Sequence, residues 1–234
     1  MNKLIIASEL NKTSLHMLHC MGYDVINFNC NPNVDDKIAH HTDISFFVYK
    51  KDIFIAKEME ELADTFISYG FNVHIEPEYL GSKYPDDVRL NCVASGDYLL
   101  CNESTVSANI LNYFKENGKT IINVKQGYTK CSVIPVADNA IITDDESVYR
   151  ICTAYGIDVL QVGKGSVALK GYDYGFIGGA SGVLDNVIVF NGDLGTHPDG
   201  EKIAEFINKY NKLYINLKPG KLEDIGSIIA LTEE

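Results

Sequence analysis

The sequence predicts an α/β fold in which five similar strand–strand–helix–strand units form a pseudo-symmetric propeller, as one domain over residues 1–234. The first observation is a set of short apolar strands that each follow Gly or Asn, residues that adopt the left-handed conformation ending many helices. These five segments begin at Gly22, Gly70, Gly118, Gly156 and Asn211. The second observation is a helical pattern before these strands, and the third is a hairpin pattern before each helix. The plan recurs at intervals of about 45 residues, which indicates a repeat architecture.

The helices are predicted from apolar residues at i, i+3, i+4 and i+7 or i+8, a spacing that places each set on one helical face. The four clear sets are Leu62, Ala63, Phe66 and Ile67; Val106, Ile110, Leu111 and Phe114; Val148, Ile151, Cys152 and Tyr155; and Ile203, Phe206, Ile207 and Tyr210. A weaker set with Leu15 and Leu18 precedes Gly22. Thr13 or Ser14 is the expected cap of this helix, since hydroxyl side chains accept hydrogen bonds from helix N-termini.

The hairpins are predicted from pairs of apolar runs joined by short polar turns. Four pairs are contiguous: "DISFFVY" with "DIFIAK", "VRLNCVA" with "DYLLCN", "CSVIPV" with "AIITD", and "GASGVL" with "VIVFNG". The fifth pair joins the two ends of the sequence, "GSIIAL" at 226–231 and "KLIIAS" at 3–8. We expect these terminal strands to complete one blade and close the ring, which would remove exposed sheet edges. An open α/β sheet built from the same elements is the alternative.

Composition and net charge limit the classes of binding partner that we expect. The net charge is −12, and 46% of the residues are apolar. A negative field repels phosphate backbones and anionic membranes, so we expect no nucleic-acid and no membrane partner, and a small cationic ligand or a basic protein patch suits it better. Neither a secretory signal nor a membrane-spanning run is recognisable, which favours a cytoplasmic protein. The six cysteines contain no C-x-x-C pair, so we expect free thiols, no metal and no cofactor.

The stretch "HTDISFFVYKKDIFI" from His41 resembles the segment of agmatine deiminases in which His-x-Asp opens a strand. Together with the five repeats, it identifies the chain as resembling the pentein superfamily, the amidinotransferase fold that includes agmatine deiminases and dimethylarginine hydrolases, in an uncharacterised bacterial branch. The resemblance implies that His41 acts as acid and base and that Asp43 binds a guanidinium group. Attack on a guanidinium carbon also needs a thiolate.

This sequence lacks a cysteine at the position where agmatine deiminases carry their nucleophile. Those enzymes end in a strand such as "GGIHCITQQ", whereas this chain ends in "GSIIALTEE", with Ala230 in place of the cysteine. Cys131 in "TKCSVI" resembles the "TCCSVL" stretch of dimethylarginine hydrolases, in which the second cysteine is catalytic. Cys92 in "LNCVAS" is the second candidate, because it lies in the blade after the His-x-Asp blade. Strand parity places Cys92 on the face of Asp43 and Cys131 on the other, unless a bulge intervenes. We favour Cys131; the alternative is that neither thiol reacts.

The blade openings are expected to converge at the axis, where penteins have their active site. Asp224 and Asp173 would supply carboxylates to a cation there. Gly178 and Gly179 belong to the glycine-rich stretch "KGYDYGFIGGASG", which is either a turn cluster or a loop whose amides line a pocket. A metal site in "GDLGTHPDG" is a weaker alternative to a helix start at Asp199.

The function expected is therefore modification or binding of a guanidino or amidino compound by a Cys/His/Asp site. The alternative is a non-catalytic pentein that binds another protein, similar in architecture to the ribosome anti-association factor. Nothing in the sequence selects the substrate, the choice between hydrolysis and group transfer, or the oligomeric state.

Overall fold

A computed structural model describes residues 3–231, and its strands form five sets of three with the same pairing. In each set the first two strands are antiparallel and the second pairs parallel with the third. The sets are β3 (Phe46–Tyr49), β4 (Asp52–Ile55) and β5 (Asn72–Ile75); β6 (Val93–Ser95), β7 (Tyr98–Cys101) and β8 (Thr120–Asn123); β9 (Val133–Ala137), β10 (Ala140–Thr143) and β11 (Asp158–Gln161); β12 (Ser181–Leu184), β13 (Val187–Phe190) and β14 (Leu213–Asn216); and β15 (Ile228–Leu231), β1 (Lys3–Ile6) and β2 (Tyr23–Ile26).

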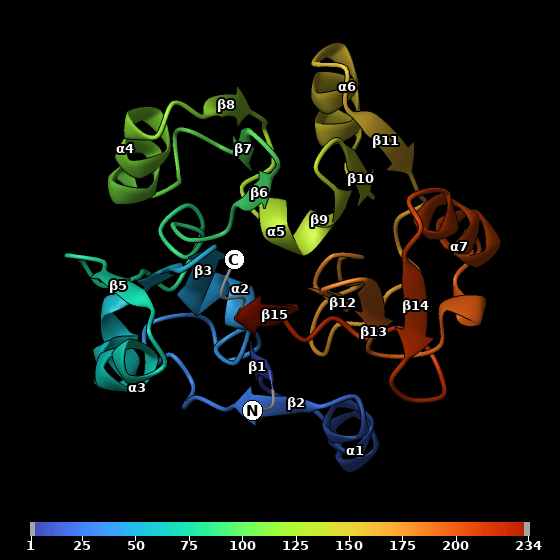
Figure 1. The fold of residues 1–234 in the computed structure, drawn as a ribbon, viewed down its shortest axis with the longest axis horizontal. Coiled ribbons are helices and arrows are strands. Elements are labelled where there is room, and N and C mark those ends of the chain that lie inside the picture. The colour runs from blue at the N-terminus through green and yellow to red at the C-terminus, as the bar shows by residue number, and fades with distance from the viewer. Residues whose placement is uncertain (1–2, 232–234) are drawn as a thin grey trace.

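A helix precedes the third strand of each set, as predicted. These helices are α3 (Ala63–Ser68), α4 (Ala108–Glu116), α6 (Glu146–Ala154), α7 (Gly200–Lys209) and α1 (Lys12–Cys20). Figure 1 shows them around the outside of the molecule, with the short helices α2 (Thr42–Ser45) and α5 (Thr129–Ser132) and strand β15 near its middle. The 3₁₀ helices are η1 (Lys57–Leu62) and η2 (Leu194–Thr196). The expected mixed α/β fold of small sheets is confirmed.

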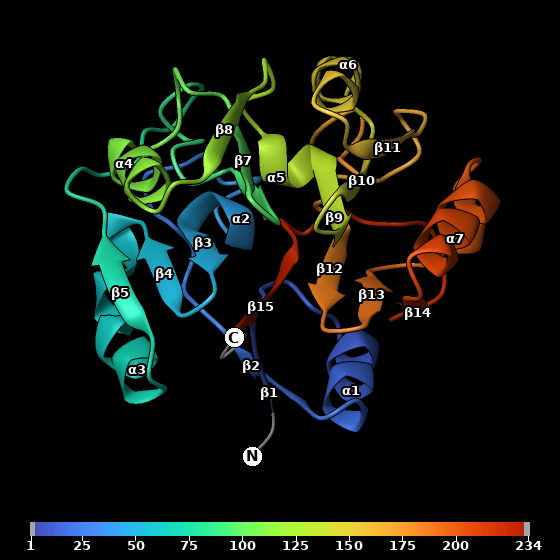
Figure 2. The ribbon, with the colours of Figure 1, turned by 45° about the horizontal axis from the view of Figure 1, so that its top comes forward.

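Two of the five sets share one sheet, which the sequence pattern did not predict. Strands β12 and β15 pair parallel, with Gly182 opposite Ile228, and this joins six strands in the order β14-β13-β12-β15-β1-β2. Figure 2 shows β12 and β15 side by side. A Cβ atom on Gly182 would lie 2.6 Å from the Ile228 Cβ. The missing side chain therefore allows the two strands to approach.

Two local predictions are wrong. The cap of α1 is Asn11, whose side chain accepts a hydrogen bond from the Ser14 amide at 2.9 Å, instead of Thr13 or Ser14. The segments containing Asp43 and Cys131 begin as single helical turns, α2 and α5, before their strands start. Strand parity assumes alternation of side chains across a sheet, so it does not apply to either residue.

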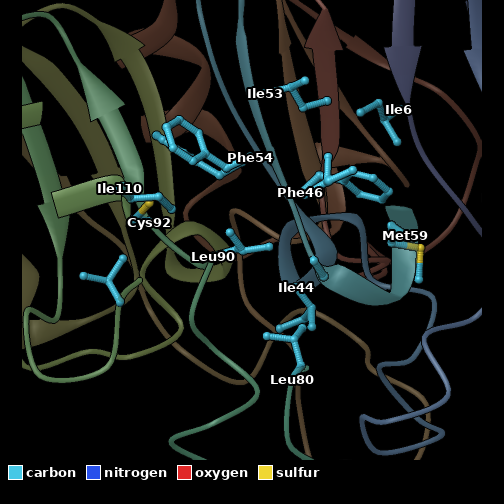
Figure 3. Close-up of a cluster of buried hydrophobic side chains, with 14 of the residues drawn as sticks. Ile6, Ile44, Phe46, Ile53, Phe54, Met59, Leu80, Leu90, Cys92 and Ile110 are labelled. Atoms are coloured by element: carbon cyan, nitrogen blue, oxygen red, sulfur yellow. The ribbon is translucent and has the colours of Figure 1, made fainter. Parts of the chain in front are cut away.

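The largest buried cluster lies between the β3-β4-β5 and β6-β7-β8 sheets and contains Phe46, Phe54, Phe66 and Phe114. Figure 3 shows part of this cluster, in which Cys92 lies among apolar side chains. Phe66 and Phe114 come from α3 and α4, so each helix packs its apolar face on the sheets. Burial of such faces is the main source of stability in a fold of this kind.

Asp145→Ala is expected to lower the free energy of unfolding by about 1 kcal/mol, because Asp145 caps α6. Its carboxylate accepts hydrogen bonds from the amides of Ser147 (2.8 Å) and Val148 (3.1 Å). The matched control is Glu146→Ala, which removes the same charge from the same helix end without removing a cap. Urea unfolding monitored by circular dichroism measures both variants, and equal losses would contradict the capping role.

Candidate functional site

The candidate site is a cavity of about 320 Å³ that brings together residues from distant parts of the sequence. His41 comes from the segment before β3, Cys131 from α5 before β9, and Asp224 from the segment before β15. The rest of the wall consists of Ile38, Ile44, Tyr128, Leu169, Tyr172, Asp173, Tyr174 and Phe176. Asp43 is fully buried behind this wall, where it touches the Cys131 thiol. The turns that open three of the strand sets thus build one site.

The Cys131 thiol is held on two sides. Its Sγ lies 3.3 Å from Asp43 Oδ2, which accepts from the thiol, and 3.2 Å from Asn91 Nδ2, which donates to the sulfur. Asn91 Oδ1 also accepts from the backbone amides of Lys130 (2.7 Å) and Cys131 (3.3 Å). One amide side chain therefore fixes both the helical turn and its sulfur.

Burial raises the pKa of the Cys131 thiol well above its ordinary value, and the negative charges of Asp43 and Asp224 raise that pKa further. The hydrogen bond from Asn91 acts in the opposite direction. The resting site consequently holds a neutral thiol at physiological pH. A positive charge placed near the two carboxylates would lower the pKa and favour the thiolate.

Asp43 is anchored by a chain of hydrogen bonds. Ser227 Oγ donates to Asp43 Oδ2 at 2.7 Å, and Lys130 Nζ lies 2.9 Å from Ser227 Oγ. The Asp43 amide donates to the Gly226 carbonyl at 2.9 Å. Asp43 Oδ1 has no hydrogen-bond partner among residues 3–231. One carboxylate oxygen therefore positions the thiol, and the other keeps its accepting capacity.

His41 and Asp224 form the second half of the site. His41 Nδ1 lies 3.8 Å from Asp224 Oδ1, and the buried Nε2 has no partner within the described part of the chain. Asp224 accepts hydrogen bonds from the amides of Phe176 and Gly226, both at 2.9 Å. Burial raises the Asp224 pKa, and nearby Asp43 adds to this, whereas His41 opposes it. The imidazole therefore has one nitrogen facing a carboxylate and one available for proton transfer.

Aromatic side chains cover one side of the cavity. The rings of Tyr128 and Phe176 are nearly parallel, with centroids 6.2 Å apart, and Tyr174 meets Phe176 edge-on at 6.5 Å. Tyr172 and Tyr174 are exposed, as is Asp173 between them. Aromatic faces attract cations, and carboxylates add to the attraction. The wall thus matches a flat or alkylated cation.

Gly178 and Gly179 are buried behind Cys131 and Asp224 and do not line the cavity. The Gly179 amide donates to the Cys131 carbonyl at 2.8 Å, and the Gly178 carbonyl oxygen lies 3.1 Å from Ser227 Oγ. A Cβ atom on Gly179 would lie 2.0 Å from Asp224 Oδ1. Close packing, with no space for a side chain, accounts for both glycines.

Cys92 does not join His41 and Asp43. Its side chain is 1% exposed in the large apolar cluster, and burial raises its thiol pKa well above the ordinary value. It lines a different cavity, with Lys130 on the wall. Of the two candidate nucleophiles, only Cys131 shares a cavity with His41.

Sequence reasoning missed Asn91, Ser227 and Tyr128 as parts of the site. Asn91 and Ser227 lie within two residues of the strands they precede. Their place at the start of a repeat unit is the sequence signal that could have found them. Tyr128 donates to Asp87 Oδ2 at 2.7 Å.

No group of three or more His, Cys, Asp or Glu side chains that could hold a metal occurs among residues 3–231. The same part of the chain has no helix whose length and apolar character would let it cross a membrane.

Asp144→Asn is expected to change the pH dependence of stability. Asp144 is 3% exposed, accepts from the Ile177 amide at 3.0 Å, and burial raises its pKa to about 7. Between pH 4 and 7 the folded state keeps a proton that the unfolded state releases, so the free energy of unfolding falls as the pH rises. An asparagine side chain stays neutral, so its burial adds no free-energy cost that grows with pH. We expect the variant to be more stable at pH 8, by on the order of 3 kcal/mol, and similar to wild type at pH 4.

Chemical denaturation at both pH values tests this, with the exposed Asp138→Asn as the control. A stability difference that is the same at pH 4 and pH 8 would contradict burial of an ionised Asp144.

A family model described as "Family of unknown function (DUF6873)" matches residues 5–229, nearly the whole chain. The chain belongs to the DUF6873 family. Curated proteins provide no match to this sequence. The DUF6873 chain is similar in structure to DDAH from Pseudomonas aeruginosa complexed with citrulline, with a TM-score of 0.60 and 10% identity, covering 98% of this chain and 99% of that one.

Two further solved structures are similar. The C. jejuni agmatine deiminase with substrate bound has a TM-score of 0.53 and 13% identity, over 92% of this chain and 76% of that one. An amidinotransferase of the saxitoxin pathway from Microseira wollei has a TM-score of 0.55 and 10% identity, over 86% and 72%. The resemblance to the pentein superfamily is confirmed for this DUF6873 chain at the level of the fold.

Proposed function

We propose that this DUF6873 protein modifies a guanidino or amidino group, with Cys131 as nucleophile, His41 as acid and base, and Asp43 and Asp224 as the groups that hold the cation. One observation carries the proposal: Cys131 and His41 line the same cavity, and the Asp43 carboxylate contacts the thiol from behind. We also propose that the five strand sets are the blades of one propeller domain over residues 1–234, with the β15–β1 hairpin completing the ring.

The reaction follows from these positions. His41 takes the proton of the Cys131 thiol, and the resulting thiolate attacks the guanidinium carbon and forms a C–S bond. The C–N bond to the leaving amine then breaks, and the leaving nitrogen takes a proton from His41. Water or an acceptor amine attacks the same carbon, His41 takes a proton back, and the C–S bond breaks. Cys131 returns as the free thiol, with a ureido product from water or a new amidino compound from an amine.

The charges support a cationic substrate. Asp43 and Asp224 are buried beside the thiol, and Asp173 adds an exposed carboxylate at the cavity wall. A guanidinium group bound there adds one positive charge beside the two carboxylates and lowers the thiol pKa, so the nucleophile forms when substrate is present. Comparable proteins are described as complexed with citrulline or bound to substrate, which supports the same ligand class.

Product formation tests the proposal. The full chain is incubated with agmatine, arginine and N-methylated arginines, with and without an acceptor amine, and ureido and amidino products are measured by mass spectrometry. We expect product from at least one compound, and loss of at least 1000-fold in Cys131→Ser. Cys92→Ser is the control and should retain activity if folded. Equal activity of wild type and Cys131→Ser would contradict the assignment.

A second candidate, a non-catalytic binding protein, is favoured by the neutral state of the resting thiol. It predicts that guanidino compounds bind, as measured by calorimetry, and are recovered unchanged. The class of partner then extends to a protein bound by one face of the propeller.

A further inference from the structure

A second cavity, of about 200 Å³, lies apart from the candidate active site and shares none of its lining residues. Within residues 3–231, the charged side chains that line it are those of Lys130 and Lys50, and Cys92, Phe46, Ile228 and Ala230 form part of its apolar wall. We infer that this cavity binds a small carboxylate that carries a short apolar chain. The inference goes beyond the proposed catalytic function, and the two sites are linked by Lys130, which also joins the chain of hydrogen bonds that anchors Asp43.

The charge of the cavity selects an anion. Both charged lining residues are lysines, in a chain whose net charge is −12. An ammonium group has three N–H donors, and Lys130 Nζ makes one hydrogen bond among the residues described, to Ser227 Oγ at 2.9 Å. The nearby charges of Asp43 and Asp224 already offset part of the cost of burying the Lys130 ammonium. A carboxylate in the cavity would accept from the remaining donors and offset more of that cost.

The remainder of the wall selects an apolar chain. The side chains of Phe46, Val93 and Ile228 are almost completely buried and line the cavity with apolar atoms. The volume corresponds to about seven water molecules at their liquid density, which accommodates a carboxylate of roughly four to six carbons. Lys50 is exposed, so the cavity wall continues to the surface there. An inorganic anion would leave most of the apolar wall uncovered.

Isothermal titration calorimetry of the full chain with butyrate and hexanoate, in chloride-free buffer, tests the inference. We expect saturable binding, stronger for hexanoate, and at least a tenfold loss in Lys130→Met. The matched control is Lys51→Met, which removes an exposed positive charge next to Lys50 without altering the cavity. It should bind as wild type does. Hexanol, which lacks the charge, should bind at least tenfold more weakly.

A second variant covers the case in which Lys130→Met does not fold. Ala230→Leu fills part of the cavity while leaving both lysines in place, and it should weaken hexanoate binding more than butyrate binding. Absence of binding to wild type at 20 mM ligand, or equal binding in wild type and both cavity variants, would overturn the inference.

Discussion

Asp43→Asn is expected to shift the reagent preference of Cys131 from the cationic chloroacetamidine toward the neutral iodoacetamide. Loss of the carboxylate that accepts from the thiol lowers the thiol pKa, so neutral iodoacetamide should react about three- to tenfold faster at pH 7.5. Cationic chloroacetamidine loses an attractive charge at the same time. The ratio of the chloroacetamidine rate to the iodoacetamide rate at Cys131 should therefore fall at least tenfold.

The control for this experiment is Asp87→Asn. Asp87 is also a buried carboxylate, but its Oδ2 accepts from Tyr128 instead of the thiol. Its removal should leave the ratio within about twofold of wild type. In the wild type, the iodoacetamide rate should keep rising with pH beyond 8.5, because the thiol pKa is raised. A plateau below pH 8, or the same ratio in Asp43→Asn and Asp87→Asn, would contradict the described electrostatics.

Gly179→Ala is expected to cause a large loss of stability, about 3 kcal/mol in the free energy of unfolding. The added methyl would lie 2.0 Å from Asp224 Oδ1 and 2.4 Å from its Cγ. Asp224 cannot move freely, because the amides of Phe176 and Gly226 hold its two oxygens. The methyl therefore displaces either the carboxylate or the backbone behind Cys131.

Thermal unfolding measures this effect, with Gly163→Ala as the control. A Cβ atom on Gly163 meets only Asp199 Oδ2, at 3.4 Å, and this control should unfold within 2 °C of wild type. Gly179→Ala should unfold about 6–12 °C lower. Equal melting temperatures for the two variants would show that the segment around Gly179 has room to adjust.

The strand and helix plan could be predicted from the sequence because it depends on local chemistry. Gly22, Gly70, Gly118 and Gly156 all have positive φ where a helix ends, and Asn211 has φ of 56° at the equivalent position. Each marks the start of a third strand. The antiparallel pairing of β15 with β1 was predicted from the apolar runs at the two ends of the chain.

The joining of β12 and β15 and the helical turns before β3 and β9 could not be predicted in this way. They depend on contacts between units, such as the approach of Ile228 to Gly182, which no local pattern encodes. The same limit applies to the site. His41 and Cys131 were found through short family motifs, whereas Asn91 contacts Cys131 across 40 residues of sequence and belongs to neither motif.

Mass mapping of chloroacetamidine adducts tests the central claim most directly. Cys20 and Cys30 are exposed and would react in any case, so the experiment uses a Cys20→Ser, Cys30→Ser background that keeps the four buried thiols. We expect one adduct, at Cys131, formed near neutral pH and slowed at least tenfold when His41→Ala is added. Slow, equal labelling of Cys92, Cys101, Cys131 and Cys152, unaffected by His41→Ala, would contradict it.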